Sequence, residues 1–106
     1  MAVIDVAIEQ DTGNRLYAAW RYAKAQWELG DYAPDRPAGL PEAVADAHCM
    51  AASAALNTYL LHPAADLRDL ALKLRVFRDE EIWDGWHLAA GIVAVLASDA
   101  NRLAHS

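Results

Sequence analysis

An acidic run at Glu80 and Glu81, followed by Asp84 and His87, is the segment of this sequence whose residue types best fit a metal site. Carboxylates and imidazoles are ordinary metal ligands, and the spacing Asp84-x-x-His87 places both side chains on one face if the segment is helical. Carboxylate-bridged dimetal bundles need such a motif twice, together with further inward-facing carboxylates. The sequence has no second copy, so we expect a solvated acidic turn and no metal or other cofactor.

Cysteine, serine and glycine give little support for catalysis. Cys49 directly follows His48, and neighbouring residues on a helix point about 100° apart, so the two side chains are poorly placed to act as nucleophile and base. The serines stand outside glycine-flanked elbows and S-x-x-K patterns. The 5 glycines are scattered and form no phosphate-binding loop. We therefore expect a protein that is not an enzyme.

Aromatic and charged residues indicate a second kind of site, a contact with another protein. Trp83 and Trp86 stand beside the acidic run, and tryptophan is enriched among the residues that dominate interface energies. Three arginines further upstream fall on one helical stripe, which either meets an acidic partner or is simply solvated. The candidate contact residues are Trp83, Trp86, Glu80, Glu81, Asp84, Arg68, Arg75 and Arg78.

The sequence predicts four helices that position these residues. In the first, over residues 14–30, apolar residues recur at intervals of four, three and four, and Gly30 is a natural stop. The stripe consists of Leu16, Trp20, Ala23 and Trp27. We expect Trp20 and Trp27 in the core for that reason. Residues 31–41 contain three prolines and should form a loop.

The second and third helices are separated by a His-Pro step. The second is expected over residues 41–61, with Pro41 in its first turn and an alanine-rich middle. The third begins with Pro63 at its first helical position, and the arginine stripe lies opposite its apolar face. That face is predicted to consist of Leu67, Leu70, Ala71, Leu74 and Phe77.

The last helix is expected to start at Asp84 or Gly85 and to end at Leu103. It is apolar nearly all round over residues 88–97, which indicates burial on most sides. That burial requires a central position in the bundle or an oligomer interface. We expect the second arrangement, in a homodimer.

Residues 1–11 are ambiguous, since Val3, Ile4, Val6 and Ile8 fit a short strand or additional helical turns, and we treat them as an arm. The 106 residues are the size of one domain. The expected fold is all-α, a small antiparallel four-helix bundle-like domain over residues 1–106 with a short N-terminal arm.

Charge and composition narrow the classes of partner. Nine basic against 15 acidic residues give a net charge of -6, which disfavours direct binding to duplex nucleic acid and to anionic membranes. The most apolar stretch is shorter than a membrane span, and Asp5 and Glu9 interrupt the first residues in a way that signal peptides do not show. With a single cysteine and no disulfide, the expected location is cytoplasmic.

The segment HPAADLRDLALKLR at residues 62–75, followed by a second amphipathic helix that ends in DANRL, resembles small uncharacterised helical proteins of alphaproteobacterial phages and prophages. The resemblance covers roughly the last 45 residues and implies a mobile-element origin. It carries over no catalytic residue.

These observations favour a non-enzymatic interaction protein. The leading hypothesis is a phage-encoded modulator or inhibitor of a host protein, for example a defence or CRISPR component. A structural homo-oligomer held by the last helix is the first alternative. A metal-binding enzyme built on Glu80, Asp84 and His87 is the second.

Overall fold

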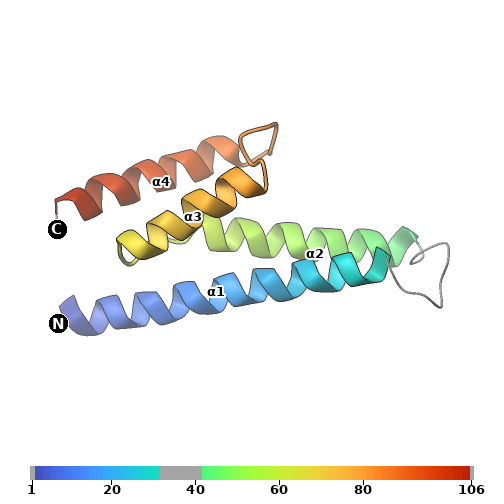
Figure 1. Ribbon diagram of the computed structural model, residues 1–106, viewed down its shortest axis with the longest axis horizontal. Coiled ribbons are helices and arrows are strands. Elements are labelled where there is room, and N and C mark those ends of the chain that lie inside the picture. Colours follow the sequence, from blue (N-terminus) through green and yellow to red (C-terminus); the bar gives the residue numbers. More distant parts are fainter. Residues whose placement is uncertain (1, 32–41, 106) are drawn as a thin grey trace.

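The computed structural model describes residues 2–31 and 42–105, and these residues form four helices and no strand (Figure 1). The helices are α1 (Ala2–Asp31), α2 (Glu42–Leu61), α3 (Leu67–Asp79) and α4 (Ala89–Ala104). The expected all-α, bundle-like fold is confirmed. None of the described helices combines the length and apolar character needed to cross a membrane.

A long antiparallel hairpin of α1 and α2 is the base of the molecule, and α3 and α4 form a shorter pair on top (Figure 1). At 1.5 Å per residue, α1 is about 45 Å long, whereas α3 is only about 20 Å long. The upper pair lies along the half of the hairpin that holds the start of α1 and the end of α2 (Figure 1). This mismatch explains extents of 53 × 29 × 18 Å.

Residues 2–11 belong to α1, so the predicted arm is a helical extension. Among the two readings that the sequence left open, the strand would leave its backbone N–H and C=O groups unpaired, because the described residues contain no strand beside it. A helix pairs those groups within the segment itself.

α3 begins at Leu67, four residues later than the proline signal predicted. Asp66 caps the helix, because its carboxylate accepts a 2.8 Å hydrogen bond from the Asp69 N–H, and the Asp69 carboxylate in turn accepts one of 3.0 Å from the Ala65 N–H. This reciprocal arrangement satisfies two backbone donors at the start of the helix. Side-chain capping at Asp66 therefore sets the boundary, and Pro63 lies in the preceding turn.

The buried face of α3 differs from the predicted one. Leu70, Lys73 and Val76 are buried, while Leu67 and Leu74 are 64% and 49% exposed. The helix is rotated relative to the prediction because the ammonium group of Lys73 has buried oxygen partners on neighbouring segments. The arginine stripe does lie on the exposed side, as expected.

α3 ends in a Schellman motif that starts the turn of residues 80–88. The Ile82 N–H bonds the Phe77 carbonyl at 3.1 Å, and the Glu81 N–H bonds the Arg78 carbonyl at 3.1 Å. Glu81 occupies the position where glycine is usual, with φ of 54°. Ile82, which follows it, is fully buried and anchors the turn in the core.

α4 starts at Ala89, later than the predicted Asp84 or Gly85, because Gly85 has a φ of 85°, which an α-helix does not use. Its buried residues, Ile92, Leu96 and Asp99, form one stripe, and Val93 is 49% exposed. Within one chain, α4 therefore lies at the edge of the bundle and not at its centre.

Candidate functional site

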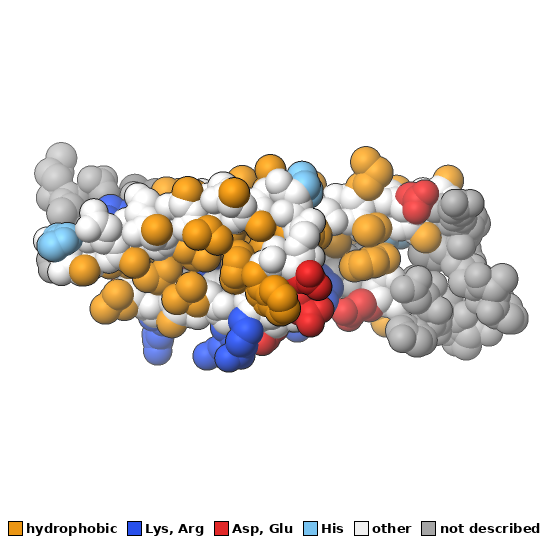
Figure 2. Space-filling model, turned by 90° about the horizontal axis from the view of Figure 1, so that it is seen from above, with side chains coloured by type: hydrophobic (Ala, Val, Ile, Leu, Met, Phe, Trp, Pro, Cys, Tyr) orange, Lys and Arg blue, Asp and Glu red, His pale blue; other side chains and the backbone are white. Residues whose placement is uncertain are grey.

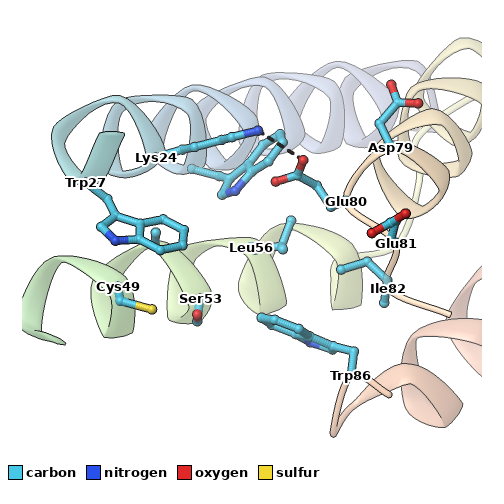
Figure 3. Close-up of a pocket in the computed structure, with 12 residues that line it drawn as sticks. Lys24, Trp27, Cys49, Ser53, Leu56, Asp79, Glu80, Glu81, Ile82 and Trp86 are labelled. Carbon is cyan, nitrogen blue, oxygen red and sulfur yellow. Dashed lines mark hydrogen bonds and ion pairs between the residues drawn. The ribbon is translucent and has the colours of Figure 1, made fainter. Parts of the chain in front are cut away.

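A pocket of about 400 Å³ lies between the α1–α2 hairpin and the end of α3 (Figure 3). Its volume is in the range of small-ligand sites. We call it the tryptophan pocket, because Trp20, Trp27 and Trp86 all line it. Asp79, Glu80 and Glu81 line it as well, so aromatic and acidic groups meet there.

The pocket has a rigid floor and two aromatic walls. Trp20 and Leu56 are 4% and 5% exposed and belong to the core. Trp86 is half-buried, and its indole N–H donates a 2.8 Å hydrogen bond to Oδ1 of Asn57 on α2, which fixes the orientation of the ring. Trp27 reaches in from α1 and points toward the stretch of α2 that carries Ser53 (Figure 3).

The floor is held by a cluster of three aromatic rings. The rings of Trp20 and Tyr59 are parallel with centroids 6.3 Å apart, and Tyr17 lies against both at 5.8 and 5.4 Å. Such pairs add to the energy of area burial. The expectation that Trp20 is a core residue is confirmed, whereas Trp27 is half-buried and forms part of the pocket wall.

A salt bridge closes one side of the pocket. Nζ of Lys24 lies 3.0 Å from a carboxylate oxygen of Glu80 and 5.5 Å from the ring centroid of Trp20. Both charged side chains are about a quarter exposed, so the pair is less screened than a surface ion pair. It joins α1 to the end of α3 across 56 positions of sequence.

Only part of the predicted acidic and aromatic site lines the pocket. Glu80, Glu81 and Trp86 do, and they come from one turn. Trp83, 60% exposed, and the exposed Asp84 belong to the same turn but are not lining residues. The turn therefore offers two surfaces, the acidic rim of the pocket and an exposed tryptophan beside it.

The three arginines of the stripe are all exposed but lie at different places. Arg68 lines a separate hollow with Asp66 and Asp69 at the start of α3. Arg75 lines a small hollow between α1 and α3, and Arg78 bonds its neighbour Asp79. None of them lines the tryptophan pocket.

Lys24, Trp27, Cys49 and Ser53 also line the pocket, and none was among the predicted contact residues. Trp20, Lys24 and Trp27 are spaced by four and three residues, so the sequence already placed a lysine on the tryptophan face of the first helix. A cation on an otherwise aromatic stripe was the available signal. The two α2 residues carried none, because an alanine-rich helix gives little indication of which face is covered.

Asp84 and His87 would share one face only in a helix, and that condition is not met, because both residues lie before α4, in the turn. In the part of the chain that the structure describes, no three histidine, cysteine, aspartate or glutamate side chains lie together as a metal site would require.

A second polar cluster is buried between α3 and α4. Asp99 accepts from Nζ of Lys73 at 3.4 Å and from Nη2 of Arg102 at 2.9 Å. Lys73 also donates to the carbonyl of His62, and Arg102 to that of Ala64. Burial lowers the pKa of Lys73, and the charge of Asp99 opposes that shift. These bonds tie the segment between α2 and α3 to α4 and serve the fold.

In comparisons with family models, curated proteins and solved structures, nothing matched this chain.

Proposed function

We propose that this chain is a non-enzymatic protein-interaction module that contacts its partner through the tryptophan pocket and the turn beside it. The pocket supports this function through its composition, because tryptophans and charged groups converge on one concave surface. Residues that dominate interface energies are enriched in tryptophan and cluster in well-packed hollows.

Rigidity of the walls supports the same function. Trp20 is packed in the core, and the indole of Trp86 is bonded to Asn57. Binding to rings that are already held in place costs less conformational entropy than binding to rings that must first be ordered. Figure 2 shows acidic and hydrophobic side chains side by side on one face of the molecule, with several basic side chains along its edge.

The proposal extends to the kind of partner. The resemblance of residues 62–75 to phage proteins favours a host protein as the target, and we propose a phage-encoded modulator or inhibitor of a defence or CRISPR component. A strongly acidic chain suits such targets, because nucleic-acid-handling proteins present basic surfaces.

A pull-down from an alphaproteobacterial lysate, followed by mass spectrometry, tests the interaction. The wild type is compared with Trp27→Ala, which removes a pocket wall, and with Tyr22→Ala. Tyr22 lies on the same helix, is 69% exposed and lines neither this pocket nor its neighbours. We expect a protein captured by the wild type and by Tyr22→Ala to be lost with Trp27→Ala.

Captured proteins that are the same for all three baits would refute a pocket-dependent interaction, provided that circular dichroism shows equal helix content. For a defence target, expression of this chain in cells that carry the defence system should raise phage plating efficiency, and Trp27→Ala should abolish that effect.

A further inference from the structure

The tryptophan pocket carries an excess of negative charge that its own residues do not balance. Asp79, Glu80 and Glu81 line it, against the single cation Lys24. Lys24 pairs with Glu80 and Arg78 with Asp79, while the described residues offer Glu81 no salt-bridge partner. Among the described lining residues, the carboxylate of Glu81 is therefore available to pair with a positive charge from outside.

Its aromatic walls favour the same kind of ligand. Both Lys24 and Arg21 already place a cation 5.5–5.8 Å from the ring centroid of Trp20. The rings of Trp27 and Trp86 have no such cation among the described residues. Indole faces attract cations through their quadrupole, so these two walls are free to hold a further one.

Glu81 has its charge at the rim despite an unfavourable backbone conformation. Its φ of 54° lies in the left-handed region, where glycine is the usual residue at the end of a Schellman motif. Strained positions of this kind cluster at binding sites. A carboxylate at this position is thus a feature of the pocket that the helix end itself does not require.

We propose that the tryptophan pocket binds an arginine side chain of the partner protein, whose guanidinium is attracted by the carboxylate of Glu81 and contacts the indole rings that line the pocket. This inference rests on the proposed function and adds the chemistry of the partner. A planar guanidinium stacks flat on indole and bonds a carboxylate through two parallel N–H groups, whereas an ammonium group acts as a point charge, as Lys24 does toward Trp20 and Glu80. Lys24 keeps the inner end of the pocket over Trp20.

A titration of the ¹⁵N-labelled protein with three blocked peptides, Gly-Arg-Gly, Gly-Lys-Gly and Gly-Gln-Gly, tests the inference. The reporters are the four indole N–H signals, because three tryptophans line the pocket and Trp83 does not. We expect saturable shifts of Trp27 and Trp86 with the arginine peptide, weaker binding of the lysine peptide, no shifts with the glutamine peptide, and an unmoved Trp83 signal.

Matched variants in the same turn separate the rim charge from general acidity. Glu81→Gln should weaken binding of the arginine peptide by about threefold, the effect of losing one partly screened ion pair. Asp84→Asn removes an equal charge from an exposed residue outside the pocket and should leave binding unchanged. Equal losses in both variants, equal shifts with the glutamine peptide, or no shifts with the arginine peptide would overturn the inference.

The titration and the pull-down fail separately. If a protein is captured through the pocket but the arginine peptide does not bind, the proposed function is supported and arginine is ruled out as the ligand. If the arginine peptide binds but no protein is captured through the pocket, the cation site is supported and the proposed interaction with a host protein is refuted.

Discussion

Lys73 of α3 and Asp99 of α4 face each other inside the protein, with Nζ and Oδ2 3.4 Å apart and exposures of 0% and 2%. Each charge is dehydrated, so each depends on the other and on the nearby carbonyl and guanidinium groups. Removal of one partner leaves the other charge buried and incompletely paired. The pair therefore decides how α3 is rotated against α4.

We predict that Asp99→Ala lowers the free energy of unfolding by about 3 kcal/mol, the usual cost of a broken buried pair. The double variant Lys73→Met with Asp99→Leu should recover most of that loss, because no buried charge remains. Urea unfolding followed by circular dichroism measures both. A loss below about 1 kcal/mol in Asp99→Ala would mean that water reaches the pair.

Tyr59 makes the stability of the protein depend on pH in the alkaline range. Burial raises its pKa well above the ordinary value of 10.0, and the nearby charge of Asp69 adds to the shift. Above pH 10.0 the unfolded chain releases this proton while the folded protein retains it, so stability falls as pH rises. The slope approaches about 1.4 kcal/mol per pH unit once the unfolded phenol is ionised.

The variant Tyr59→Phe should remove that slope. Its effect near neutral pH should be small, because the buried hydroxyl has no hydrogen-bond partner among the described residues. Lys73 acts in the opposite direction, since its lowered pKa makes stability rise as pH approaches the ordinary lysine value. The difference between wild type and Tyr59→Phe in urea unfolding at pH 9 to 11 isolates the phenol. A difference that does not change with pH contradicts the prediction.

Glu81→Gly should make the protein more stable. A non-glycine residue in the left-handed region costs about 1 kcal/mol, and glycine at this position relieves it. We expect the free energy of unfolding to rise by about that amount, while Glu81→Ala, which keeps the strained Cβ and also loses the carboxylate, should change it little. If both variants changed stability equally, the carboxylate and not the backbone would be responsible. Both variants should weaken binding of the arginine peptide.

The helices themselves could be predicted from the sequence because apolar spacing and proline positions act locally. The rotation of α3 could not, because Lys73 has the residue type of a solvated face and is buried only through Asp99, 26 positions away. A periodicity argument assigns each lysine to water by default. The partner oxygens that reverse this assignment are visible only in the folded protein.

The candidate site was predictable in part for a similar reason. Glu80, Glu81 and Trp86 could be found because they are close in sequence. Trp27 lies more than fifty positions before them, and its helical spacing with Trp20 indicated a core residue. It joins the pocket wall because α3 is too short to cover the hairpin beyond its own end (Figure 1).

The outer face of α4 gives a prediction about assembly. Only one stripe of α4 is buried within the chain, and Val93 remains about half exposed on an otherwise small-residue surface. We predict a homodimer in which two such faces meet, and Val93→Lys should convert it to a monomer because a charge would enter the contact. Light scattering at high micromolar concentration measures the mass. A wild-type protein that remains monomeric would refute both this interface and the hypothesis of a structural homo-oligomer.

Trp83 gives the sharpest test of the contact surface around the pocket. At 60% exposure it contributes little to the fold, so Trp83→Ala should leave stability unchanged and weaken partner binding by about 2 kcal/mol or more. Trp86→Ala should weaken binding as well but also reduce stability, since Asn57 loses its hydrogen bond and the core loses a packed ring. Charge reversal at Arg68, Arg75 and Arg78 should act mainly on association rate and its salt dependence.

The measurement is a titration of each variant against the protein identified by the pull-down, with urea unfolding of the same samples. Tyr22→Ala, which removes another exposed aromatic side chain from α1, controls for general loss of hydrophobic surface. Unchanged affinity in Trp83→Ala would confine the contact to the pocket itself. A drop in stability for Trp83→Ala would instead show that its ring packs against the core, and Trp83 would then no longer count as part of the proposed contact surface.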